Sequence, residues 1–225
     1  MTTKKLFVSV FVALLISFIS TSARADTVTF TSFGAFSSFS NANGLTQENV
    51  LTPGAFTGTT VPGFTNQTNT QVNVTSLTAT QLSVAGANGQ AIFTGLNGTA
   101  IGSGGFTISL ANGQAFTSLA FNLNNVQGAT GTITITTLEI NGDITQTQFS
   151  LANGSNFFGV AAINGQQIFS ITVGPGVAIQ DLRQVRIGPA QAPSTEVPEP
   201  ATMVLLGSGL LGIAGWTRRK RGRQR

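Results

Sequence analysis

Few side chains in this 225-residue sequence could carry out chemistry, and three useful residue types are missing. The sequence contains no His, no Cys and no Tyr, and Trp occurs once. These absences exclude disulfide bonds, thiolate nucleophiles, imidazole bases and zinc sites built from Cys and His. A Ser-His-Asp triad cannot be assembled from this chain. We therefore expect no catalytic site, no cofactor and no enzyme activity.

Two carboxylates, Glu139 and Asp143, remain as candidates because they flank one predicted turn and could converge. A converging pair could act as the general acid and base of a hydrolase. The same oxygens, with backbone carbonyls, could form a weak Ca²⁺ site, although no Asp-x-Asp-x-Asp-Gly loop supports one. A solvated hairpin tip explains the pair more simply, so we expect no catalytic and no metal-binding residue and keep both alternatives open.

One predicted strand, residues 179–187, carries Asp181, Arg183 and Arg186. Successive side chains of a strand point to opposite faces, so the spacing of three places the two arginines on opposite faces. Asp181 is expected to form a surface ion pair with these arginines, and such a pair contributes little to stability.

Carbohydrate binding is an alternative that lacks its usual aromatic residues. Sugar rings stack most often on Trp or Tyr, and the only Trp lies at position 216, outside the predicted body. Phenylalanine could substitute, and it recurs every three residues at Phe30, Phe33, Phe36 and Phe39. That spacing fits neither a flat strand nor a core helix, and most phenylalanines are expected in the core.

Rows of threonine suggest a further alternative. Thr132, Thr134 and Thr136 occupy one face of a predicted strand, and residues 27–31 repeat the pattern. Such rows can order surface water, as ice-binding surfaces do. β-Branched Thr is also common on any exposed strand face, and the rows do not recur at a fixed solenoid period. Ice binding is therefore the weaker interpretation.

The elements that would position these residues are strands. Asn-Gly, the favoured dipeptide of type I′ turns, occurs seven times between residues 43 and 165. Segments such as 71–77 and 106–110 alternate polar and apolar residues, and we count about ten strands. The sequence predicts an all-β body over residues 26–189, an antiparallel two-sheet sandwich of jelly-roll type, followed by a linker over 190–196.

The positive charge of the chain lies at its two ends. The sequence pI of 10.8 would suit a nucleic-acid-binding protein. However, residues 1–25 carry a formal net charge of +3 and residues 195–225 carry +4, whereas residues 26–194 carry −3. The body is mildly acidic and contains no Lys, so we predict no nucleic-acid partner.

The N-terminal segment has the pattern of a signal peptide. Lys4 and Lys5 precede an apolar stretch over residues 6–19, and the small residues Ala23 and Ala25 flank Arg24. This pattern predicts a signal helix over residues 1–25 that signal peptidase removes by cutting before Asp26. The body would then be exported.

The C-terminal segment contains a short motif, an apolar stretch and a basic cluster, in that order. The motif consists of Val197, Pro198, Glu199, Pro200 and Ala201. The apolar stretch over 201–216 has 16 residues, and as a helix it would span roughly 24 Å. The basic residues after it are Arg218, Arg219, Lys220, Arg221, Arg223 and Arg225. We predict a single transmembrane helix whose C-terminus is cytoplasmic by the positive-inside rule.

Residues 197–225 resemble the PEP-CTERM sorting domain of Gram-negative bacteria, in which a Pro-Glu-Pro motif, a transmembrane helix and an Arg-rich end follow one another. The resemblance implies recognition by an exosortase, removal of the tail near the motif, and delivery to the cell surface or the exopolysaccharide matrix. An ordinary C-terminal anchor that happens to contain two prolines is the alternative.

We therefore predict a secreted, non-catalytic protein of the cell surface or extracellular matrix of a biofilm. Before processing it would be anchored in the inner membrane, with signal peptidase and an exosortase as partners. The alternative is a carbohydrate-binding module that acts in the exopolysaccharide matrix. A third hypothesis is a hydrolase that uses Glu139 and Asp143.

Overall fold

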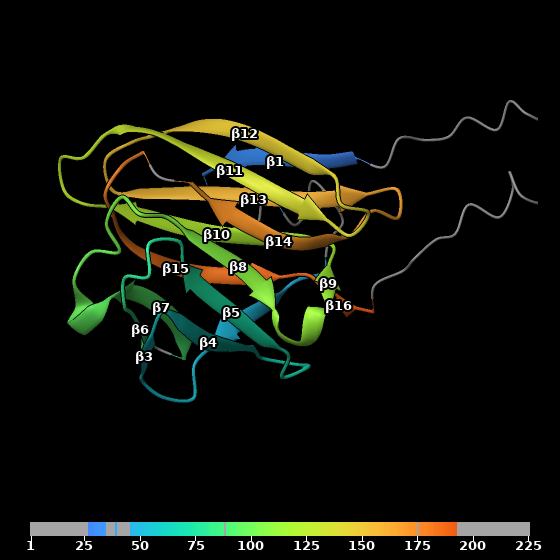
Figure 1. Ribbon diagram of the computed structural model, residues 1–225, viewed down its shortest axis with the longest axis horizontal. Helices are drawn as coiled ribbons and strands as arrows, with labels where there is room; N and C mark the ends of the chain where they lie inside the picture. The colour runs from blue at the N-terminus through green and yellow to red at the C-terminus, as the bar shows by residue number, and fades with distance from the viewer. Residues whose placement is uncertain (1–26, 35–38, 40–45, 88, 175, 193–225) are drawn as a thin grey trace, which may run out of the picture.

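A computed structural model describes residues 27–34, 39, 46–87, 89–174 and 176–192 (Figure 1). In these ranges the chain forms sixteen strands and two short 3₁₀ helices, and every strand pair is antiparallel. The first eight strands are β1 (Thr27–Phe33), β2 (Glu48–Leu51), β3 (Phe56–Gly58), β4 (Thr60–Thr65), β5 (Gln71–Ser76), β6 (Leu82–Ala87), β7 (Gln90–Gly95) and β8 (Phe106–Leu110). The others are β9 (Ala115–Phe116), β10 (Ser118–Asn125), β11 (Gly131–Glu139), β12 (Ile144–Leu151), β13 (Ser155–Ile163), β14 (Ile168–Val173), β15 (Ile179–Ile187) and β16 (Ala190–Gln191). The 3₁₀ helices are η1 (Leu96–Gly98) and η2 (Ala111–Gly113).

The alternation of polar and apolar residues explains why these segments are strands. In β5, Val72 and Val74 are fully buried while the residues between and beside them are exposed or half-buried. In β11, Ile133 and Ile135 point into the core and the threonines beside them point outward. The all-β prediction is confirmed, with more strands than expected because short pairings such as β3, β9 and β16 leave little pattern in a sequence.

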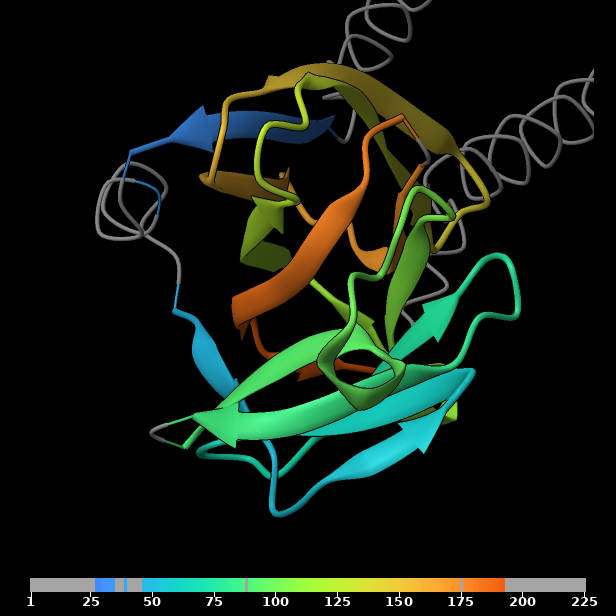
Figure 2. The same ribbon diagram turned by 90° about the vertical axis from the view of Figure 1, so that its left-hand side faces the viewer.

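The strands join into one continuous hydrogen-bonded sheet. Its main path runs β1-β13-β10-β15-β7-β2-β4-β5-β8-β14-β11-β12, and β3, β6, β9 and β16 attach to its side. The layers predicted as two separate sheets are therefore connected through β15 and β2, which hydrogen-bond to neighbours on both sides. Figure 2 shows that the sheet curves around the interior rather than lying flat.

The two ends of this path meet. The edge strands β1 and β12 contact each other, and Figure 1 draws them side by side at the top of the molecule. Their backbones are not paired in any described ladder. The sheet thus folds back on itself, so that its two edge strands meet at a seam between β1 and β12.

The interior of the roll is filled with aliphatic and aromatic side chains. Phe93, Phe106 and Phe121, which come from three different strands, are fully buried there. A second, small cluster lies on the outer side of the sheet, where the ring of Phe39 covers Ala120 and Ala161. The ring is so close to the backbone of β13 that a Cβ on Gly159 would lie 2.3 Å from it.

The Asn-Gly pairs follow the turn prediction in part. At residues 97–98, 112–113 and 164–165 both residues have positive φ, as a type I′ turn requires. At 141–142 and 153–154 only the glycine does. Residues 43, 44 and 88 lie outside the described ranges.

Candidate functional site

The structure places Glu139 and Asp143 at one hairpin, as predicted, but in different surroundings. Glu139, at the end of β11, is 5% exposed. Its carboxylate accepts hydrogen bonds from Thr145 Oγ1 (2.6 Å) and from Gln166 Nε2. Asp143 is exposed at the tip, where its carboxylate accepts a hydrogen bond from Asn141 Nδ2 (2.8 Å). Each carboxylate thus has its own neutral hydrogen-bond partners.

The same hairpin is the location of the alternative Ca²⁺ site that the sequence leaves open. Within the described ranges, no cluster of three or more Asp, Glu, His or Cys side chains could hold a metal ion. The oxygens of Glu139 that a Ca²⁺ ion would need are bonded to a hydroxyl and an amide.

A polar chain links Glu139 to the point where the chain leaves the body. Gln166, which donates to Glu139, accepts a hydrogen bond from the backbone N–H of Gln167 (3.0 Å). Gln167 Nε2 in turn donates to Gln191 Oε1 (2.6 Å), in β16. Because β16 also pairs with β9, the last described strand is fixed to the sheet. Ala190 and Gln191, the first residues of the predicted linker, are thus part of a strand.

Glu48 is a second buried carboxylate, and sequence reasoning gave it no role. It lies on β2 and accepts hydrogen bonds from the backbone N–H groups of Gln67 and Thr68, both 2.9 Å long. Burial raises the pKa of Glu48, but the hydrogen bonds from Thr68, Gln67 and Thr65 outweigh burial, and the net effect lowers the pKa. Glu48 therefore holds the turn between β4 and β5.

The expected ion pair is present, on the outer face of β15. Arg183 Nε and Nη2 each lie 2.5 Å from an oxygen of Asp181. This hydrogen bonding raises the pKa of Arg183. Asp181 is only 4% exposed, and its carboxylate also accepts a hydrogen bond from Asn124 (3.4 Å). The pair is more deeply embedded than a surface ion pair.

The prediction that Arg183 and Arg186 lie on opposite faces is wrong. They pair with Asn122 and Ala120, two residues apart on β10, so β15 contains one extra residue there. Gln184, with a φ of 53°, marks this β-bulge. The bulge shifts the alternation by one residue and brings both arginines to the outer face.

The three recurring phenylalanines that the structure describes pack against other parts of the protein. Phe30 packs against the main core. Phe39 is 2% exposed and stacks on Phe33 with ring centroids 5.3 Å apart. Phe36 lies outside the described residues. These rings pack against each other and against the sheet.

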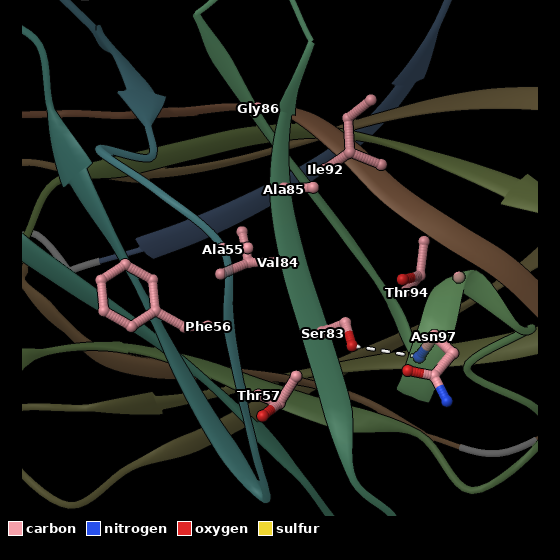
Figure 3. A pocket seen from close by; sticks show the side chains of 11 residues that line it. Ala55, Phe56, Thr57, Ser83, Val84, Ala85, Gly86, Ile92, Thr94 and Asn97 are labelled. Atoms are coloured by element: carbon pink, nitrogen blue, oxygen red, sulfur yellow. Dashed lines mark hydrogen bonds between the residues drawn. The ribbon is translucent and has the colours of Figure 1, made fainter.

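A shallow pocket of about 410 Å³ lies beside β3, β6 and β7 (Figure 3). Its polar groups come from Thr57, Ser83, Thr94 and Asn97, and Ser83 Oγ accepts a hydrogen bond from the Asn97 N–H (3.3 Å). Phe56, 39% exposed, lines it as well. No ionisable side chain lines this pocket, so it offers no acid–base chemistry.

The predicted threonine rows along single strands are present, and the register creates a longer row across strands. Neighbouring strands β4, β5, β8, β14 and β11 each place one threonine opposite the next. We call this set the threonine row: Thr60, Thr75, Thr107, Thr172 and Thr136. All five point outward, Thr60 exposed and the others half-buried. A single sequence does not display this row, because it depends on strand register.

The strands around the threonine row carry no exposed charge. A second row beside it consists of Pro62, Asn73, Ser109, Ser170, Leu138 and Ile144. The six strands β4, β5, β8, β14, β11 and β12 contain one ionisable residue, Glu139, which is buried. Asp181 and both body arginines lie on β15, outside this face.

The predicted processing sites, Ala23, Ala25 and the segment from Val197 to Arg225, lie outside the described residues. Among the described residues, no helix is long and apolar enough to cross a membrane. The predicted signal and transmembrane helices both fall in undescribed parts of the chain.

The solved structures that match this chain differ greatly from it in sequence. A family 11 carbohydrate-binding module from Clostridium thermocellum, in complex with a β-1,3-1,4-mixed-linked tetrasaccharide, is 12% identical with a TM-score of 0.26, over 73% of this chain and 98% of that chain. A family 11 module of a cellulosomal cellulase from the same organism is 10% identical with a TM-score of 0.26, over 76% of this chain and 99% of that chain. The enzymatically active domain of bacteriophage CBA120 tailspike protein 4 is 16% identical with a TM-score of 0.21, over 72% of this chain and 19% of that chain. TM-scores this low carry no argument about the fold or the function of this chain.

The C-terminal segment does match a known family. No curated protein matches the chain. Residues 196–220 match the family described as the PEP-CTERM protein-sorting motif. This match covers the Pro-Glu-Pro motif, the apolar stretch and the first basic residues, the same parts on which the resemblance rests. The chain therefore carries a PEP-CTERM protein-sorting motif between Glu196 and Lys220.

Proposed function

We propose that the chain is an exported, non-catalytic protein of the cell surface or extracellular matrix, which an exosortase sorts and cleaves at the Pro-Glu-Pro motif. The match of residues 196–220 to the PEP-CTERM motif carries this proposal. In the precursor, signal peptidase removes residues 1–25. A transmembrane helix then holds the protein in the inner membrane, with its basic C-terminus in the cytoplasm.

The described strands lie between the two proposed cuts. β1 begins at Thr27, two residues after Ala25, and β16 ends at Gln191, seven residues before Pro198. Both proposed cuts therefore leave the strands intact. We propose that the body between them is a sandwich of jelly-roll type, as its antiparallel, curved sheet supports.

The sorting proposal predicts the C-terminus of the mature protein. In the native host, the mature chain should end near Pro198 and be found at the surface or in the matrix. Replacing Pro198, Glu199 and Pro200 together by Ala should leave the tail uncut and the protein in the membrane fraction. Mass spectrometry of C-terminal peptides measures both results.

Pro193→Ala is the matched control, because it removes a proline from the linker and leaves the motif unchanged. It should be processed like the wild type. An intact C-terminal peptide in surface-exposed wild-type protein would contradict the proposal.

A second candidate function is a carbohydrate-binding module. The observation that favours it is the uncharged face of hydroxyl and amide groups around the threonine row. Retention by immobilised polysaccharide tests this function independently of sorting.

A further inference from the structure

We propose that the threonine row binds a neutral polysaccharide chain that lies across the strands. The inference rests on the second candidate function and gives it a site and a class of ligand. The ligand is a polymer of uncharged sugars. The spacing of the threonines, the hydrogen-bonding capacity of their hydroxyls and the lack of exposed charge on these strands all favour it.

The geometry of the row suits an extended polymer. Its five threonines come from adjacent strands, each opposite the next in the register. Because neighbouring strands lie about 4.8 Å apart, the row is about 19 Å long. A regular spacing of this size is comparable with the length of one sugar unit in an extended chain, so successive sugars would meet equivalent groups.

The hydroxyls of the row keep capacity for a ligand. The hydroxyls of Thr60 and Thr75 share a hydrogen bond of 3.0 Å, and so do those of Thr107 and Thr172. A hydroxyl has one donor and two acceptor positions, so each pair retains one donor and three acceptor positions. The methyl groups offer apolar contact to the C–H faces of sugars. Sugars present this same combination of hydroxyls and C–H groups.

Charge selects among polysaccharides. The six strands of the face have no exposed ionisable side chain, whereas Arg183 and Arg186 lie on β15. A polyanionic polysaccharide would find no cation on the face to offset the loss of its hydration, and desolvating a charge is costly. A neutral polysaccharide has no charged groups to desolvate when it binds. The face therefore fits neutral sugars better than acidic ones.

Two other interpretations make distinct predictions. A planar ice lattice needs a flat array, but adjacent strands of a sheet are rotated by roughly 20–25°, so a row across five strands turns. A flexible polymer can follow that turn. The pocket beside Phe56 is another location where a sugar could bind, through an exposed ring and nearby hydroxyls.

The test uses the full-length chain, purified in a polyoxyethylene detergent because sugar-based detergents would compete. Retention is measured on beads that carry hydroxyethylcellulose, dextran or galactomannan, and on alginate beads as the acidic comparison. All binding is measured in about 0.5 M NaCl, which shortens the screening length enough to suppress attraction by the basic tail.

The main variant is Thr107→Val with Thr172→Val, which removes two central hydroxyls and preserves shape and β-propensity. The net contribution of each hydrogen bond predicts about tenfold weaker retention for the pair. Thr136→Lys, which adds a charge to the row, is a second variant in case the first fails to fold. Thr31→Val, which changes an exposed threonine on β1 outside the row, is the matched control and should bind like the wild type.

Retention by at least one neutral polysaccharide, lost in both row variants and kept in Thr31→Val, would support the site. Equal retention by folded row variants would overturn it and leave a carbohydrate-binding function possible elsewhere. Loss in Phe56→Ala alone would move the site to the pocket and overturn the proposal. Preference for alginate, retention by none of the neutral polymers, or inhibition of ice growth without retention would each overturn it too.

Discussion

At the scale of single residues, the two buried glutamates show how this fold uses ionisable groups. Glu139 is bonded to a hydroxyl and a side-chain amide, whereas Glu48 is bonded mainly to backbone N–H groups. Backbone donors cannot move away without unfolding the turn, so they stabilise the charged form of Glu48 in particular. Both carboxylates thus have structural roles.

Replacing Glu48 by Gln should destabilise the protein at neutral pH by about 1–2 kcal/mol, because it removes charge-assisted hydrogen bonds. The pKa of Glu48 is lower in the folded protein than its ordinary value of 4.5. Its stabilising effect is therefore complete above that value and is lost as the pH falls through the lowered pKa. Urea denaturation of both proteins at pH 7 and at pH 3 measures the difference.

Asp143→Asn is the matched control, since it neutralises an exposed carboxylate at a hairpin tip. It should change the free energy of unfolding by no more than about 0.5 kcal/mol. A stability gap between Glu48→Gln and the wild type that stayed constant down to pH 3 would show that charge on Glu48 is not the cause.

At the scale of elements, the contact between Phe39 and β13 accounts for the glycine within that strand. A Cβ at position 159 would lie 2.3 Å from the Phe39 ring. Gly159→Ala should therefore destabilise the protein by roughly 1–3 kcal/mol through overpacking. In a protein that already carries Phe39→Ala, Gly159→Ala should lower the free energy of unfolding much less, because the obstructing ring is gone. Thermal unfolding of the four proteins in this cycle measures the coupling, and additive effects would contradict the contact.

Much of the fold was predictable because it depends on local patterns, and much of the site was not because it depends on register. Alternation over 71–77 and 106–110 correctly predicts strands with one buried face. The bulge at Gln184 follows no alternation rule, so the faces of Arg183 and Arg186 were mispredicted. The threonine row combines residues as distant as Thr60 and Thr172, which only strand pairing brings together.

At the scale of the whole molecule, processing should reverse the sign of the charge. The full chain has a formal net charge of +4 and a sequence pI of 10.8. A product that spans residues 26–197 has six carboxylates and two arginines, a net charge of −4. Isoelectric focusing should therefore show an acidic surface form. The variant lacking the Pro-Glu-Pro motif should focus at a higher pH than that form, since it keeps the basic tail, and a basic surface form would contradict cleavage.

The order of the strands also determines when this protein can fold. β1, the first described strand in the sequence, pairs with β13, and Thr27 lies opposite Ile163. β15 lies between β10 and β7 and joins the two halves of the sheet. The roll cannot close until residues up to about 187 are available, and such long-range pairing is slow. The proposed export from the N-terminus would therefore deliver most of the chain, up to β15, before the sheet could be completed.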